Sequence, residues 1–157
     1  MSTDFLLEDF LPYQITVLAS HIALAFSKQH AERFGLSIPE WRVVATIGRY
    51  QSVTSAFLQE KTAMDKAKVS RAVTRLVASK LLERTENQAD LRSNYLSLTP
   101  EGLTLFNKIV PIAKRLEQEM ISQVSAEELA TFKKVLQCFD QYILQEHQSS
   151  LDGNAYV

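Results

Sequence analysis

The chain has 157 residues, of which 46% are hydrophobic and 22% charged, and it contains only four glycines and four prolines. This composition is typical of one compact domain, with or without an added helical layer, and it excludes long low-complexity linkers. No apolar run approaches the roughly 20 residues that span a bilayer, and the acidic start lacks the basic region of a signal peptide. We therefore expect a cytoplasmic protein without membrane contact.

The first third of the chain is predicted to form two helices. Apolar residues recur at intervals of three and four between residues 9 and 34, and Gly35 marks a stop. Ser37 is a suitable N-cap for a second helix, which carries Pro39 and Glu40 in its first turn. This second helix is apolar nearly all round and ends between residues 48 and 52, so we expect it to lie in the core.

A helix-turn-helix follows. Thr54 or Ser55 begins a short third helix that ends near Lys61, and a turn over residues 62–64 comes next. Asp65 then caps a fourth helix that ends near Ser79. Two short helices joined by a turn of three or four residues are typical of this motif.

The pattern then changes to strands and returns to helices. Residues 82–85 and 94–98 are predicted strands, and the polar stretch between them predicts the tip of a β-hairpin, or wing. Thr99 caps a fifth helix that begins at Pro100 and is expected to kink at Pro111. A capping box over residues 125–128 starts a sixth helix, whose apolar residues repeat strictly at three and four. Residues 148–157 are predicted to be a flexible tail.

The fourth helix carries the functional prediction. If Val69 marks the centre of its buried face, the opposite arc holds cations, hydroxyls and small side chains. Arginine can bond the O6 and N7 atoms of guanine, and serine and threonine can bond either base type, so this arc suits the major groove of DNA. An ordinary solvated basic helix is the alternative. The predicted DNA-binding residues of this helix are Lys66, Lys68, Ser70, Arg71, Thr74 and Arg75.

The distribution of charge supports a polyanionic partner. The whole chain has a net charge of −1, but residues 61–92 contain eight basic and four acidic residues, a net charge of +4. The rest of the chain then carries −5, so one region attracts a polyanion while the remainder repels it. In the wing, Arg92 is a candidate for minor-groove insertion, with Asp90 holding its guanidinium in position. An exposed pair of little energetic value is the alternative there.

Several blocks in order resemble the MarR family of bacterial regulators. They are Gly35-Leu36-Ser37, Glu40-Trp41, residues 64–71 (Met-Asp-Lys-Ala-Lys-Val-Ser-Arg), residues 81–84 (Leu-Leu-Glu-Arg), Asp90-x-Arg92-Ser93 and residues 96–102 (Leu-Ser-Leu-Thr-Pro-Glu-Gly). The resemblance implies a homodimer built from the first, fifth and sixth helices, which recognises a pseudo-palindromic operator in double-stranded DNA. It places Ser70, Arg71, Thr74 and Arg75 in the groove and Asp90 with Arg92 in the wing. Ala63 departs from the family pattern, which has a glycine in the turn, and Leu91 replaces a frequent arginine.

The resemblance also implies a small-molecule effector. Members of this family are often released from DNA by aromatic or phenolic acids, and the candidate lining residues here are Ser20, His21, Trp41 and Arg42. Arg42 or His21 can pair with a carboxylate and Trp41 can stack on a ring, although a core position for Trp41 is the alternative. Some relatives instead sense oxidants through a thiol near the N-terminal helix, whereas the lone cysteine of this chain lies in the predicted sixth helix.

The remaining candidate groups point away from other chemistry. The lone cysteine, Cys138, excludes a disulfide framework and a cysteine-based zinc site, and we predict that it is a buried structural thiol on the sixth helix. His30 and His147 lack partners at metal-binding spacing, so no metal or cofactor is expected.

The predicted fold is therefore mainly α-helical with a small β-hairpin wing: a winged helix-turn-helix with a helical dimerisation layer. Residues 1–34 and 99–147 are assigned to dimerisation, and residues 35–98 to the DNA-binding lobe. The predicted function is a ligand-responsive repressor; the alternative is a winged-helix module for protein assembly without DNA binding. An enzyme is disfavoured because the chain has no glycine-rich phosphate loop and no nucleophile–base motif.

Overall fold

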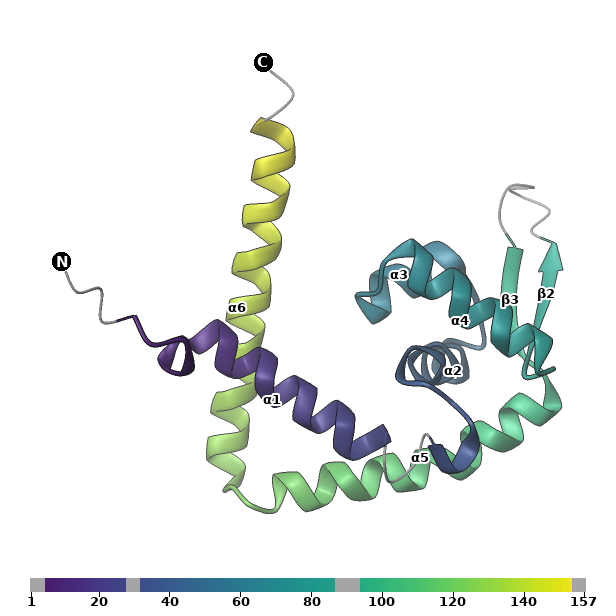
Figure 1. The fold of residues 1–157 in the computed structure, drawn as a ribbon, viewed down its shortest axis with the longest axis horizontal. Coiled ribbons are helices and arrows are strands. Elements are labelled where there is room, and N and C mark those ends of the chain that lie inside the picture. Colours follow the sequence, from purple (N-terminus) through teal and green to yellow (C-terminus); the bar gives the residue numbers. More distant parts are fainter. Residues whose placement is uncertain (1–4, 28–31, 87–93, 154–157) are drawn as a thin grey trace. The chain divides into compact units, whose positions relative to one another are not determined.

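A computed structural model describes residues 5–27, 32–86 and 94–153 (Figure 1). Six α-helices and three strands occupy these ranges, with short 3-10 turns at Leu7–Asp9 and Glu32–Phe34. In chain order they are α1 (Leu11–Phe26), α2 (Ile38–Tyr50), β1 (Ser52–Thr54), α3 (Ser55–Thr62), α4 (Lys66–Ala78), β2 (Leu82–Glu86), β3 (Asn94–Leu98), α5 (Pro100–Ile121) and α6 (Ala126–Gly153). The predicted class, a mainly helical winged helix-turn-helix, is confirmed. Within the described ranges, none of the helices is both long enough and apolar enough to cross a membrane.

The winged lobe contains a three-stranded antiparallel sheet in the order β1-β3-β2. The predicted hairpin is present, with Leu82 opposite Leu98 and Glu86 opposite Asn94. The third strand, β1, was not predicted. It pairs with the far edge of β3, where Val53 lies opposite Leu96, and it leads directly into α3. The wing is therefore joined to the helix-turn-helix through a shared sheet.

The core of this lobe lies between α2, α3, α4 and the sheet. Val43, Val44 and Ile47 of α2 are fully buried, as the apolar pattern of that helix predicts. They belong to one buried cluster that also includes the apolar side chains of α4. This close packing holds α4 firmly against the rest of the lobe. The other fully buried large side chains are Leu58, Val69, Leu76, Leu96 and Ile109.

Local signals place most helix starts where we expected them. Ser37 Oγ accepts from the Glu40 amide at 3.4 Å, and a Glu40 carboxylate oxygen accepts from the Ser37 amide at 2.7 Å, which completes a capping box. Thr54 caps α3 by accepting from the Phe57 amide. The turn between α3 and α4 passes through Ala63 in the left-handed region, at φ 52° and ψ 33°.

Helix lengths differ from the predictions at both ends of the chain. The first helix was expected over residues 9–34, but α1 ends at Phe26 and Glu32–Phe34 forms a separate 3-10 turn. The apolar repeat identifies the face of a helix better than its end, so it overestimated this length. The sixth helix reaches Gly153, within the residues predicted as a tail. Pro111 lies inside a continuous α5.

The chain divides into two compact units, residues 1–114 and 115–157. The first contains the winged lobe and α1, and the second contains the end of α5 and all of α6. In the second unit, Ser125 and Glu128 form the predicted capping box, with hydrogen bonds of 2.8 Å and 3.2 Å. Cys138 is exposed on α6, so the prediction of a buried thiol is wrong for the single chain. That prediction assumed that the apolar stripe of α6 is covered within the chain.

Candidate nucleic-acid interface

Helix α4 is fixed at its start and along one face. The Asp65 carboxylate accepts from the Lys68 amide at 2.7 Å and also lies 3.2 Å from the Lys68 ammonium. The backbone hydrogen bond from Lys68, followed by its side-chain bond, lowers the pKa of Asp65 below the ordinary value of 3.8. The face toward the core consists of Val69, Ala72, Val73 and Leu76. The predicted rotation of this helix is therefore confirmed.

The opposite arc of α4 is open to solvent. All six predicted DNA-binding side chains of this helix are exposed, and the Arg75 side chain retains 73% of its accessible surface. Three cations, Lys68, Arg71 and Arg75, follow each other at intervals of three and four, so they share one side of the helix. The exposed arc carries no large apolar side chain, as expected for a surface that meets a polar ligand.

The start of α2 borders this arc. A shallow hollow of about 260 Å³ is lined by Ser37, Pro39, Glu40, Lys68, Arg71, Ala72 and Arg75. Glu40 is 7% exposed, and its second carboxylate oxygen lies 3.8 Å from Nη1 of Arg75. Sequence reasoning missed this pairing. The motif Ser37-x-x-Glu40 identifies the cap, but only the packing of α2 on α4 brings Glu40 to Arg75.

The base of the wing is tied to α5. Thr99 donates its hydroxyl to the Lys80 carbonyl at 2.7 Å, and its amide donates to the Leu81 carbonyl at 3.1 Å. The same hydroxyl accepts from the Gly102 amide at 3.0 Å, so Thr99 is the predicted N-cap. These bonds fix the two residues that precede β2 against the start of α5. The predicted wing pair, Asp90 and Arg92, lies outside the described residues.

The candidate effector residues lie on α1 and α2. Ser20 and His21 are exposed, and Ser20 donates its hydroxyl to the Thr16 carbonyl at 2.9 Å. Arg42 is exposed, whereas Trp41 is half-buried. The centroids of the Trp41 and Phe26 rings lie 5.4 Å apart, with 33° between the ring planes. Trp41 therefore contributes to the contact between α1 and α2. An effector site formed by all four residues stays a prediction.

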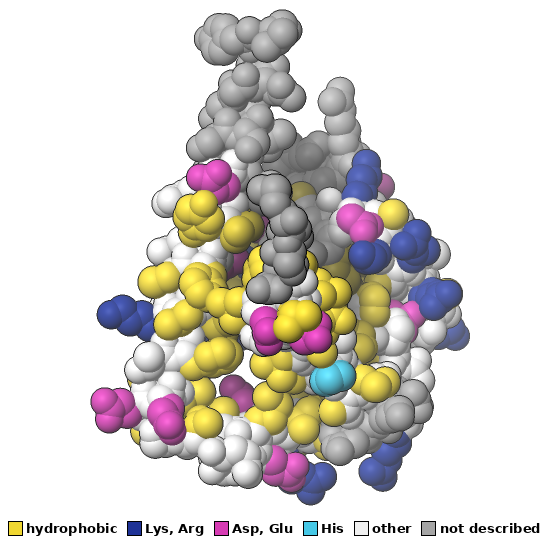
Figure 2. Space-filling view, turned by 60° about the vertical axis from the view of Figure 1, so that its left-hand side comes forward, with side chains coloured by type: hydrophobic (Ala, Val, Ile, Leu, Met, Phe, Trp, Pro, Cys, Tyr) yellow, Lys and Arg dark blue, Asp and Glu magenta, His cyan; other side chains and the backbone are white. Residues whose placement is uncertain are grey.

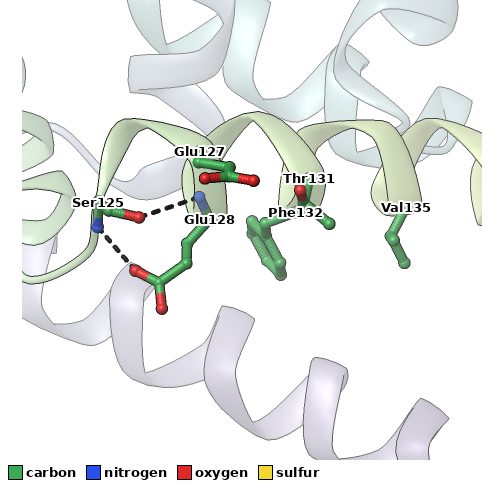
Figure 3. Close-up of a pocket in the computed structure, with 6 residues that line it drawn as sticks. All are labelled: Ser125, Glu127, Glu128, Thr131, Phe132 and Val135. Carbon is green, nitrogen blue, oxygen red and sulfur yellow. Dashed lines mark hydrogen bonds between the residues drawn. The ribbon is translucent and has the colours of Figure 1, made fainter.

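A second surface lies along α6. Side chains 131–146 are all exposed, and those of Phe132, Leu136, Phe139 and Ile143 repeat along one face. A hollow of about 750 Å³ opens over the first turns of this helix, where Phe132 and Val135 project beside the capping box (Figure 3). Figure 2 shows how much apolar surface the chain presents (yellow). Such surface is unusual on a monomer and is typical of an interface.

Comparisons with known proteins agree with this architecture. Residues 34–93 match the model of the MarR family. The transcriptional regulator HosA of Escherichia coli is 25% identical over 123 residues, which cover 75% of this chain and 91% of HosA. The structure of Bordetella bronchiseptica BpsR, whose DNA binding is regulated by 6-hydroxynicotinic acid, has a TM-score of 0.77 at 23% identity, with coverage of 87% of this chain and 96% of that one. A MarR variant from Escherichia coli in complex with operator DNA has a TM-score of 0.71 at 21% identity, covering 87% of this chain and 99% of that one.

The fold and the exposed basic arc of α4 define a winged helix-turn-helix protein of the DNA-binding class. Helix-turn-helix proteins recognise DNA by placing the second helix of the motif in the major groove. Over residues 34–93, the chain is similar to the MarR family of transcriptional regulators.

Proposed function

We propose that this chain is a sequence-specific transcriptional regulator that binds double-stranded DNA as a homodimer, with α4 of each protomer in the major groove. The observation that carries the proposal is the division of α4 into two faces. Its apolar face is buried in the lobe, while Arg71, Thr74 and Arg75 are exposed on the other side. A helix held in this way can enter the groove without losing its packing.

The roles of the exposed residues follow from their positions. Arg71, Thr74 and Arg75 lie beyond the first turn and are suited to base edges, together with Ser70. Lys66 and Lys68 lie at the N-terminal end, where ammonium groups suit phosphates. Asp90 and Arg92 are proposed wing contacts. Phosphate contacts orient the protein, whereas base contacts select the sequence.

Dimerisation is proposed from the apolar faces that a single chain leaves exposed. On α1 these side chains include Leu11, Leu18 and Leu24, which retain 49%, 49% and 52% of their surface. On α6, Phe132 and Ile143 retain 50% and 51%. Covering such half-exposed side chains contributes on the order of 1–2 kcal/mol each, so a second copy of the chain is the simplest partner. A two-fold dimer would place its two α4 helices about 34 Å apart, one turn of DNA.

An effector response is the finer part of the proposal. We propose that a small aromatic carboxylate binds near Ser20, His21, Trp41 and Arg42 and releases the repressor from DNA. The support is chemical: α2 offers the exposed side chain of Arg42 for a carboxylate and the half-buried indole of Trp41 for an aromatic ring. Such a ligand shifts the DNA equilibrium only by its different affinity for the two dimer shapes, typically about 1–3 kcal/mol.

A salt series tests DNA binding against the alternative of a protein-interaction module. Binding to a labelled random-sequence duplex pool is measured between roughly 50 and 200 mM salt, where proteins with several phosphate contacts lose affinity steeply. The proposal predicts such a loss, and it predicts a shallower slope for Lys68→Ala. A duplex affinity that is absent or flat across the series would favour the interaction module.

The effector proposal has its own measurement. Trp41 is the single tryptophan, so its fluorescence reports on the proposed site. Titration with 6-hydroxynicotinic acid or salicylate should quench this emission and release bound duplex over the same concentration range. The Arg42→Ala variant should lose both responses, and an unchanged response in that variant would refute the assignment.

A further inference from the structure

Glu40 is a buried carboxylate at the edge of the proposed DNA-binding surface. One of its oxygens accepts from the Ser37 amide at 2.7 Å, and the other lies 3.8 Å from Nη1 of Arg75. The Glu40 side chain is 9% exposed, whereas that of Arg75 is 73% exposed. The same acid therefore joins the start of α2 to the outer side of α4.

The cap does not require a charge at this position. Glutamine completes a capping box as well as glutamate does, because only an acceptor oxygen is needed. A nearly buried carboxylate costs free energy unless a cation and hydrogen bonds compensate it. Since the guanidinium is mostly in water, the ion pair itself adds little stability. The charge of Glu40 thus calls for a reason other than folding.

The geometry points to orientation of the arginine. A free arginine side chain samples many rotamers, but its planar fork carries five N–H donors in fixed relation. The ion pair between Nη1 and Glu40, at 3.8 Å, restricts the side chain, which stays 73% exposed and so keeps other donors accessible to a ligand. Preorganised donors lose less entropy when they bind a base.

We infer that Glu40 is a positioning residue for Arg75: it holds the guanidinium in the orientation that reads DNA sequence, without touching DNA itself. This inference rests on the proposed function. Lys68 and Arg71 line the same hollow, so the carboxylate also lowers the local positive charge. A residue that merely repelled phosphate would weaken all duplexes equally, whereas a positioning residue affects discrimination between them.

The test uses Glu40→Gln, which keeps an acceptor for the Ser37 amide and removes the charge. Affinities are measured for a selected duplex and for its single-base variants, after far-UV circular dichroism has verified the fold. We expect discrimination between duplexes to fall about three- to ten-fold at the base positions where Arg75→Ala also weakens the base preference. An effect of this size is typical of two residues in contact. The double variant Glu40→Gln/Arg75→Ala should discriminate no worse than Arg75→Ala alone.

Ser37→Ala is the matched control. It removes the other half of the capping box, the Oγ that accepts from the Glu40 amide, but leaves the carboxylate beside Arg75. It should lower the melting temperature and keep the base preference. Arg75→Lys changes the other partner of the ion pair and leaves the capping box intact. This variant should discriminate less between duplexes while its affinity keeps the same dependence on salt. A preserved base preference would overturn the inference.

Other outcomes are equally decisive. The carboxylate does not position the arginine if Glu40→Gln tightens binding to every duplex alike. The same conclusion follows if the double variant loses as much discrimination between duplexes as the two single variants lose together. A wild-type protein that shows no duplex preference would refute the proposed function itself. Selective wild-type binding with an unaffected Glu40→Gln variant would refute only the role of Glu40.

Discussion

The junction between the wing and α5 offers a sharp test of the packing, through the substitution Gly102→Ala. A Cβ atom added at Gly102 would lie closer than 3.0 Å to the Leu81 carbonyl oxygen and 3.3 Å from Cδ2 of Leu98. The Leu81 oxygen already accepts from the Thr99 amide at 3.1 Å, so it cannot move without loss of that bond. The obstacle is main chain, which no rotamer change relieves.

The cost can be estimated from two contributions. Insertion of a methyl group into a filled space typically costs about 1–3 kcal/mol. Displacement of the Leu81 carbonyl would weaken a backbone hydrogen bond worth about 1 kcal/mol. Together they predict a loss of roughly 2–4 kcal/mol, which for a chain of this size lowers the melting temperature by roughly 4–16 °C.

Urea unfolding followed by circular dichroism, at fixed protomer concentration, measures this loss. Gly48→Ala is the control. Its added Cβ would lie 2.5 Å from Cε2 of Phe106, so the obstacle is a half-buried side chain instead of the main chain, and alanine gains helix propensity there. We expect that variant to lose less stability than Gly102→Ala, because a side chain can shift where a carbonyl held by a backbone hydrogen bond cannot. Equal losses in the two variants, or a stable Gly102→Ala protein, would refute this description of the junction.

Three further predictions concern α4 and the turn before it. Arg71→Ala should weaken binding to a selected duplex by about 1–3 kcal/mol and relax its base preference, whereas Lys68→Ala should weaken all sequences alike; equal small effects in gel-shift titrations would contradict these roles. Ala63→Gly should raise the free energy of unfolding by about 0.5–1 kcal/mol, because Ala63 has a positive φ of 52°, and a loss in urea titration would disprove this. Asp65→Asn keeps the cap but removes a carboxylate whose pKa is lowered in the fold. The wild type should therefore have the higher free energy of unfolding above pH 3.8, and this difference should decline as the pH falls further. A difference that grows in acid, measured by urea unfolding across this pH range, would contradict the prediction.

Local signals explain why so much of the lobe could be predicted. Ser37, Thr54, Asp65 and Thr99 each cap a helix with their own side chain, and these short-range bonds depend on few neighbours. The rotation of α4 also follows from sequence, because the apolar repeat that begins at Val69 determines which side is buried. Both faces of the proposed DNA-binding helix could therefore be identified before the fold was known.

Long-range features were less accessible. β1 is only three residues long and gains its strand character from pairing with β3, more than 40 residues later in the chain. The contact of Glu40 with Arg75 depends on the packing of α2 on α4, which sequence spacing does not reveal. The exposure of Cys138 was mispredicted because an apolar repeat indicates burial without saying whether the cover is the same chain or another.

Selection of bound duplexes from a random pool tests the central claim most directly. If exposed side chains of α4 read the major groove in a two-fold dimer, the selected sequences should contain two inverted half-sites with centres about 10 base pairs apart. The Arg71→Ala protein, selected in parallel, should yield a weaker consensus at matching positions in both halves. A wild-type pool that stays random through successive rounds would contradict the account.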